Sequence, residues 1–362
     1  MRVERGNSNG GMPSGGGMLS FSSPVSRELV HRRAIAEVFM TDIRRVGEGR
    51  YMAAAQWPRL HMFYHSVAGM YDTALIAESL RQATILVAHT MEGVPLGQAF
   101  LMPDMAVHTL DGLSRHSGAP TEVHVGLEVN VPQRNGRGPA VMRVGARFYV
   151  GGQLIATGSA GARLVEPEAY ARMRLRSATD DPARGITPLP PDRVGHRFSW
   201  NVVIGESGGG DAWPLHVDDT NPILFDHPLD HVPGLLLVEA IRQAIRAQTG
   251  FPELDFLTFN VSFLKIVELN DDACVSLLSV ETDLQDEGRA SAEITIRGIA
   301  YVQFSCRFTL NVPKEPRLQQ GLSPGRSDGP GSGTRPDWLR EPVPATGSTT
   351  FPQFAPAHQR GA

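Results

Sequence analysis

The segment from Phe225 to Arg246 reads FDHPLDHVPGLLLVEAIRQAIR. Its first part is a turn-forming stretch of His, Asp and Pro residues, and the Pro-Gly pair then leads into an apolar run with the period of a helix. Glu239, Arg242 and Gln243 are polar positions of that run. Because they lie three and four residues apart, they share one face of the helix. The segment therefore predicts a buried helix with one polar face, entered through a polar loop.

A second stretch repeats this pattern. Residues 71–83 read YDTALIAESLRQA, in which AESLRQA matches VEAIRQA of the later helix. Glu78, Arg81 and Gln82 thus take the places of the three polar residues above. Two further landmarks accompany the match: Trp-Pro pairs at 57–58 and 213–214, and PLGQAFLMPDMAVHTL where the second half has ELDFLTFNVSFLKIV. We interpret the chain as an internal duplication.

Strand patterns follow each helix. Residues 121–132 show apolar side chains at every second position, as a half-buried strand requires. One helix followed by long antiparallel strands predicts an α+β unit in which a sheet wraps a helix, and the two units should form an intramolecular pseudo-dimer. We expect helices at 72–91 and 234–249. We expect strands within 28–46 and at 51–56, 96–108, 121–132, 140–165 (turn at 151–152), 197–204, 255–267, 273–282 and 290–312.

Composition suggests where the units end. Residues 1–26 and 314–362 are rich in Gly, Ser and Pro without apolar periodicity, so we expect disordered tails. Residues 181–194 contain a Pro-rich linker. The expected division is a first repeat at 27–180 and a second repeat at 195–313.

Charge and cysteine content restrict the function. A formal net charge of -4 gives no electrostatic reason to expect a nucleic-acid partner. Two cysteines are too few for a disulfide scaffold or a zinc finger, and we expect neither a metal nor another cofactor. No run is apolar enough to span a bilayer and no signal peptide is evident, so a cytoplasmic location is expected.

Through the motifs HVPG, VEAIRQA and AESLRQA, the chain resembles the A-factor biosynthesis family. This resemblance implies an α+β tandem (double) hotdog fold. AEVFMTD and AAAQWPRLHMFY are similar to that family too. The resemblance covers about residues 29–312. It implies an acyltransferase that moves a β-ketoacyl group from acyl carrier protein to dihydroxyacetone phosphate during synthesis of γ-butyrolactone autoregulators. Acyl carrier protein and dihydroxyacetone phosphate are then the expected partners, with a homodimer as a further assembly.

The expected site lies on the two matched helices. Glu239 and Glu78 are the candidate catalytic carboxylates, and Arg242 and Arg81 are the candidate phosphate ligands because guanidinium binds phosphate bidentately. Gln243 and Gln82 lie on the same faces and are further candidate substrate-binding residues. The N–H groups at Gly234 could polarise a thioester carbonyl, as in hotdog enzymes, with His231 beside them. A purely structural ion-pair lattice is the alternative interpretation of the Glu/Arg pairs, and His231 could equally be a capping group.

The same motifs bear on three alternatives: a dehydratase, a thioesterase and a non-catalytic binding protein. Dehydratases of this fold carry a catalytic His at the position of Phe225, and here His227 and His231 are nearby but out of register, which argues against dehydration. A hotdog thioesterase, or a non-catalytic protein that binds acyl thioesters, would share the same motifs. A basic group that could dock an acidic carrier protein, or simply be solvated, is formed by Arg172, Arg174 and Arg176.

Overall fold

The computed structural model describes residues 18–64, 71–110, 119–135, 138–174, 185–208, 212–283 and 287–310. Most of the two expected tails and the first part of the expected linker lie outside these ranges. Residues 18–26 are described, and the Val25 N–H donates to the Met40 carbonyl at 2.9 Å. Part of the stretch expected as a tail is therefore hydrogen-bonded to the folded chain.

The first half contains two helices, seven strands and two short 3-10 helices within the described residues. In order they are η1 (Arg27–Val30), η2 (Ile35–Glu37), β1 (Met40–Gly47), β2 (Arg50–Trp57), α1 (Thr73–Thr90), β3 (Ala99–Leu101), β4 (Asp104–Thr109), β5 (Thr121–Asn135), β6 (Gly138–Val150), β7 (Gln153–Val165) and α2 (Pro167–Arg174).

The second half repeats this plan with a shorter opening strand. Its described elements are η3 (Pro191–Val194), η4 (Ser199–Asn201), β8 (Ala212–Pro214), α3 (Gly234–Thr249), β9 (Asp255–Phe263), β10 (Ala273–Thr282), β11 (Glu287–Ile296) and β12 (Ile299–Thr309).

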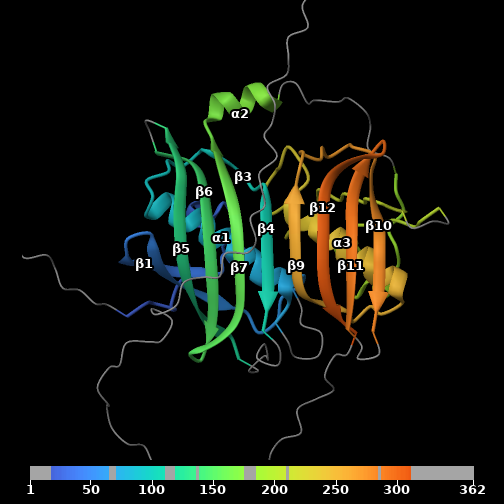
Figure 1. Cartoon of the computed structure of the whole chain (residues 1–362), viewed down its shortest axis with the longest axis horizontal. Coiled ribbons are helices and arrows are strands. Elements are labelled where there is room, and N and C mark those ends of the chain that lie inside the picture. Colours follow the sequence, from blue (N-terminus) through green and yellow to red (C-terminus); the bar gives the residue numbers. More distant parts are fainter. Residues whose placement is uncertain are drawn as a thin grey trace, which may run out of the picture. The chain divides into compact units, whose positions relative to one another are not determined.

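All the strand pairs are antiparallel, and the strands of both halves form one ladder in the order β1-β2-β5-β6-β7-β4-β9-β12-β11-β10-β8, with β3 on β7. The halves join where β4 pairs with β9, with Met105 opposite Val261 and Val107 opposite Phe259. Figure 1 shows β4 and β9 side by side, with α1 and α3 behind the same face of the sheet. The expected tandem hotdog fold is confirmed, and the two sheets are continuous at their shared edge.

Helix α1 is buried on nearly all sides because the sheet wraps around it. Fifteen of its 18 residues are buried. Asp72 caps the helix, since its carboxylate accepts the Ala74 N–H at 2.8 Å. Close contact with the sheet depends on Gly158 of β7, where an added Cβ would lie 2.9 Å from Leu80 Cδ2.

The backbone confirms the duplication and extends it upstream. Gln82 Oε1 accepts the Phe39 N–H and Gln243 Oε1 accepts the Val203 N–H, both at 2.9 Å. Counting back from these contacts, residues 27–37 and 191–201 align without gaps, so that η1 and η2 match η3 and η4. We therefore propose that the second repeat includes η3, which the sequence analysis assigned to a linker.

One sequence landmark is wrong. Met40 pairs with Ala55 in the first half, and the equivalent bridge in the second half joins Ile204 to Leu215. Trp213 therefore matches Ala53, two residues before Ala55, and not Trp57. The Trp-Pro pairs resemble each other without being structurally equivalent.

Several element predictions need correction. The apolar stretch at 35–39 begins as a 3-10 helix and the strand starts only at Met40. Residues 197–204 contain η4 and an isolated bridge where a strand was expected. The expected strand at 290–312 is two strands, because the backbone turns at Arg297 and Gly298, which both have positive φ. The short elements α2 and β8 were not predicted.

Candidate active site

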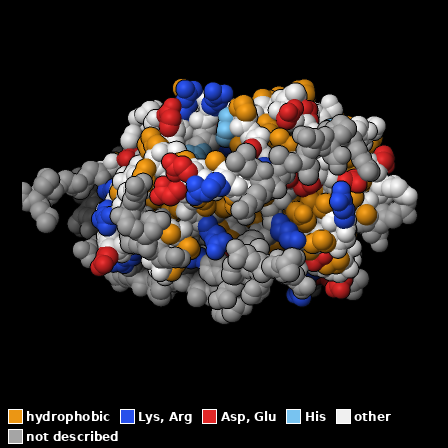
Figure 2. Space-filling view, turned by 90° about the horizontal axis from the view of Figure 1, so that it is seen from above, with side chains coloured by type: hydrophobic (Ala, Val, Ile, Leu, Met, Phe, Trp, Pro, Cys, Tyr) orange, Lys and Arg blue, Asp and Glu red, His pale blue; other side chains and the backbone are white. Residues whose placement is uncertain are grey.

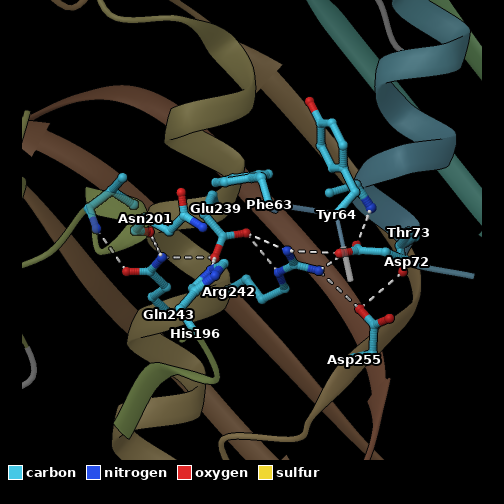
Figure 3. A network of polar contacts seen from close by, with 12 residues as sticks. Phe63, Tyr64, Asp72, Thr73, His196, Asn201, Glu239, Arg242, Gln243 and Asp255 are labelled. Carbon is cyan, nitrogen blue, oxygen red and sulfur yellow. Dashed lines mark hydrogen bonds and ion pairs between the residues drawn. The ribbon is translucent and has the colours of Figure 1, made fainter. Parts of the chain in front are cut away.

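The polar face of α3 forms a closed ionic cluster with residues of both halves. Arg242 Nε donates to Glu239 Oε2 at 2.8 Å. Its Nη1 reaches Asp72 of the first half at 2.6 Å and Asp255 of β9 at 3.3 Å. Figure 3 shows the Arg242 guanidinium between Glu239 on one side and Asp72 and Asp255 on the other. These four side chains are 1–7% exposed.

Neighbouring donors occupy the remaining acceptor positions of Glu239. His196 Nε2 and Gln243 Nε2 both contact Glu239 Oε1 at 2.8 Å. Although burial opposes ionisation, Arg242 and His196 hold the pKa of Glu239 well below its usual range. A carboxylate with its acceptors occupied and a strongly lowered pKa is a poor proton acceptor. This cluster is suited to hold the two halves in register.

The corresponding face of α1 forms a second cluster. Arg81 donates from Nε to Glu78 Oε2 and from Nη2 to Oε1, each at 2.8 Å. Arg32 Nη2 lies 2.7 Å from Glu78 Oε1, and Gln82 donates to the same oxygen at 2.7 Å. Burial raises the pKa of Glu78, but the two guanidinium groups outweigh it and the pKa falls to about 2.

This first-half cluster also receives residues from the loop before α3. Arg32 Nη1 lies 3.2 Å from Asp226 Oδ1. The other oxygen of Asp226 accepts the Arg33 N–H at 2.7 Å, and His227 Nδ1 contacts Oδ1 at 2.5 Å. The α1 face and the α3 entry loop therefore build one site together.

A pocket of about 580 Å³ opens beside the first-half cluster. Side chains of both halves line it, and four of its eight residues are Arg or His: Glu28, His31, Arg32, Arg33, Leu96, Gly97, His227 and Pro228. Arg33 is exposed, and among the described residues its guanidinium has no carboxylate partner. The volume of the pocket is within the range of small-molecule sites.

The two clusters differ in composition at matched positions. Arg32 aligns with His196, Arg33 with Arg197, and His31 with Gly195. Arg81 is 21% exposed, whereas its counterpart Arg242 is 2% exposed. The duplicated helix thus supports an open basic site in the first half and a sealed cluster in the second.

The remaining predicted residues lie elsewhere. His231 contacts Asp230 at 2.6 Å, near Tyr170 of α2, and does not line the pocket. Gly234 begins α3 in close contact with Phe263, whose ring an added Cβ would meet at 3.0 Å. The N-cap residue of α3 makes no side-chain hydrogen bond to the helix.

The predicted basic group on and after α2 is partly neutralised. Arg174 is paired with Asp230 and Glu268, Arg172 is exposed, and Arg176 lies outside the described residues. Figure 2 shows acidic, basic and hydrophobic side chains interspersed on the face seen there. That face does not present one sign of charge.

Arg32, Arg33, Asp226 and the pocket residue His31 are site residues that the sequence did not identify. A signal was present, because VHRR at 30–33 aligns with VGHR at 194–197 upstream of the matched helices. That alignment becomes visible only when the contacts of Gln82 and Gln243 set its register.

These features define a class: a tandem hotdog protein whose candidate active site is built where its two units meet. The described helices include none long and apolar enough to cross a membrane. A family model described as "A-factor biosynthesis hotdog domain" matches residues 17–166 and 177–300, and the chain belongs to this family.

Relatives in Streptomyces match this chain over much of their length. The chain is 39% identical over 255 residues to a "2-oxo-3-(phosphooxy)propyl 3-oxoalkanoate synthase" of Streptomyces virginiae, covering 69% of this chain and 85% of the relative. A protein of the same name in Streptomyces coelicolor is 39% identical, covering 63% and 73%. Among solved structures, an oleoyl thioesterase (putative) of Lactobacillus plantarum aligns with a TM-score of 0.46 and 12% identity, covering 71% of this chain and 96% of that one.

Proposed function

We propose that this protein transfers a 3-oxoacyl group from a thioester to the hydroxyl of dihydroxyacetone phosphate in the cytoplasm, as a step in γ-butyrolactone signal synthesis. The acyl donor in this proposal is acyl carrier protein. The name shared by the relatives contains both halves of such a product, a 3-oxoalkanoate and a 2-oxo-3-(phosphooxy)propyl unit. We further propose that the working site is the first-half pocket.

The observation that carries the proposal is the basic pocket beside Glu78. A phosphate ester needs positive charge that is accessible and not already neutralised. Arg33 meets both conditions, and His227 and the part-exposed Arg81 lie nearby. Arg242, the phosphate ligand favoured by the helix motif, meets neither because three carboxylates surround it in a buried cluster.

Glu78 acts here as an anchor for the two guanidinium groups. Its carboxylate fixes Arg32 and Arg81 in place, and Asp226 fixes Arg32 from the other side. Charged donors that are held before the substrate arrives lose little entropy on binding. Glu78 is therefore a positioning residue, and we assign the Glu239 cluster to joining the halves.

The loop that carries Asp226 and His227 continues into the first turn of α3. A helix start exposes N–H groups and the positive end of the helix dipole. In this proposal the N–H groups at Gly234 polarise the thioester carbonyl, which develops negative charge as the hydroxyl attacks. One loop would then serve both the phosphate and the acyl group.

The test is mass spectrometry of the protein with a 3-oxoacyl thioester and dihydroxyacetone phosphate. A phosphorylated ester is expected. Arg33→Ala should raise the KM for dihydroxyacetone phosphate by about tenfold or more, the loss of one charge-assisted contact. Arg197→Ala, the change at the matched second-half position, should leave the KM unchanged.

Three results would contradict the proposal. Free acid that forms equally well without dihydroxyacetone phosphate would indicate a thioesterase. A thioester that stays intact even when presented on carrier protein would indicate a non-catalytic binding protein. Equal effects of Arg33→Ala and Arg197→Ala would remove the first-half pocket as the phosphate site.

A further inference from the structure

His31 lines the first-half pocket and is hydrogen-bonded to a second histidine, His89. His31 Nε2 and His89 Nε2 are 2.9 Å apart, and His89 Nδ1 is 2.8 Å from the Val94 carbonyl oxygen. A carbonyl can only accept, so Nδ1 of His89 carries its hydrogen. The neutral His89 ring then accepts at Nε2, and His31 must donate from Nε2. This sequence of hydrogen bonds leaves Nδ1 of neutral His31 as an open proton acceptor.

The backbone at His31 has an unusual conformation. His31 has φ of 51°, in the left-handed region, while the matched residue in the second half is Gly195 with φ of 75°. A left-handed conformation at a non-glycine residue costs on the order of 1 kcal/mol. The first half thus carries an imidazole where glycine would be less strained, at a position that lines the pocket. Its ring packs edge-on against Phe100 at 5.0 Å.

We propose that His31 is the general base of the acyl transfer and that His89 sets its tautomer. This inference rests on the function proposed above. His31 Nδ1 takes the proton of the acceptor hydroxyl while that oxygen bonds to the thioester carbon. The carbon–sulfur bond then breaks, and the imidazolium returns the proton to the departing thiolate. The products are an ester and a free thiol.

Neither carboxylate of the matched helices competes for this role. The oxygens of Glu78 and Glu239 already accept hydrogen bonds from guanidinium, amide and imidazole donors, so neither carboxylate is available to a substrate hydroxyl. His31 shares the pocket wall with the proposed phosphate ligands, so an acceptor bound there brings its hydroxyl close to an unoccupied ring nitrogen.

The surroundings of His31 tie its basicity to phosphate binding. Burial, followed by the charge of Arg81, lowers the pKa of His31 to about 4, so the free site holds a neutral ring at pH 7. The other charged groups at the pocket are Glu28, Arg32 and Arg33. A phosphate dianion beside Arg33 opposes the positive charges, raises the pKa of His31 and makes it a stronger base once the acceptor is bound.

Nitrogen NMR of the ¹⁵N-histidine-labelled wild-type protein tests the hydrogen-bond pattern directly. We expect His31 protonated at Nε2 and His89 at Nδ1 at pH 7, and a His31 pKa that rises by about one unit or more when inorganic phosphate is added. His31 protonated at Nδ1 would overturn the assignment without touching the proposed function, and so would a His31 pKa that stays unchanged although phosphate binds.

Kinetics supply the second test. His31→Gln should lower kcat about 100-fold or more and leave the KM for dihydroxyacetone phosphate within about threefold. His89→Phe should displace the acid limb of the kcat profile, and His89→Gln, whose amide oxygen can accept from His31, should restore part of the activity. His108→Gln, at an exposed strand position, is the control.

A His31→Gln protein with kcat within about threefold of wild type would contradict the role of His31 as the general base. If the wild-type protein forms no phosphorylated ester, both the proposed function and the proposed role of His31 are wrong. The two failures are therefore distinguishable.

Discussion

Replacing Arg242 by methionine should destabilise the protein far more than the same replacement at Arg81. Arg242 compensates three carboxylates that are at most 7% exposed. Breaking a buried ion pair by removing one partner costs about 3–5 kcal/mol. Arg81 is 21% exposed, and Glu78 keeps Arg32 when Arg81 is removed, so about 1–2 kcal/mol is expected there.

Urea unfolding at pH 7, followed by circular dichroism and tryptophan fluorescence, measures both losses. The pH dependence supplies an independent check. The lowered pKa of Glu239 stabilises the wild-type fold above the unfolded pKa of about 4.3, and this stability is lost as pH falls. Without Arg242, protonation of the buried carboxylates stabilises the folded variant. The difference in unfolding free energy between wild type and Arg242→Met should therefore narrow from pH 7 to pH 4.

Equal losses for the two variants would refute this reasoning. So would a gap that stays constant across that pH range, because the carboxylates would then not be charged in the folded protein. An Arg242→Met protein with full stability but no activity would move the working site to the second half.

Two further predictions follow from single contacts. Gly158→Ala should lower the unfolding free energy by about 1–2 kcal/mol, because the new methyl group meets Leu80 and lies 3.1 Å from the Ala106 carbonyl oxygen. Gly126→Ala, whose new methyl group has contacts no closer than 3.5 Å, should not destabilise the protein. Equal melting temperatures of the two variants would contradict this prediction. The Glu78 pKa, lowered from 4.5 to about 2, corresponds to about 3 kcal/mol that is present at pH 7 and lost as pH falls through this range. Glu78→Gln should therefore show a shallower loss of unfolding free energy between pH 5 and pH 3, and an unchanged slope would count against the buried ion pairs.

The parts of the fold that could be predicted from sequence are those set by local pattern. Helix α3 begins at Gly234 and ends at Thr249 as expected, because the Pro-Gly entry and the left-handed Gly250 are local signals. The strand at 273–282 has the predicted bounds. The matched helices correctly indicated two copies of one unit.

The parts that could not be predicted depend on contacts between distant segments. Arg32 and Asp226 are 194 positions apart, and only the meeting of the two halves makes them partners. Whether a cluster is sealed or open also depends on packing. The sequence motif around Glu239 is the more distinctive of the two, yet Glu239 lies in the buried cluster. The matched residue Glu78 is the one that lies beside the pocket, where it pairs with Arg32.

The 3-10 helix at 35–37 illustrates a related limit. It lies in the largely apolar stretch AIAEVFM, but Gln82 accepts the Phe39 N–H and donates to the Glu37 carbonyl, which holds the segment against α1. A side chain more than 40 positions away therefore determines where β1 can begin.

The shared ladder between β4 and β9 has a consequence for how such proteins can evolve. In an assembly of two identical subunits, every substitution appears twice, so both sites must tolerate it. Fusion into one chain removes that constraint: His31 can change while Gly195 stays, and Arg32 can differ from His196. One copy can then have an open pocket while its counterpart keeps a buried ionic cluster, a difference that two-fold symmetry would forbid.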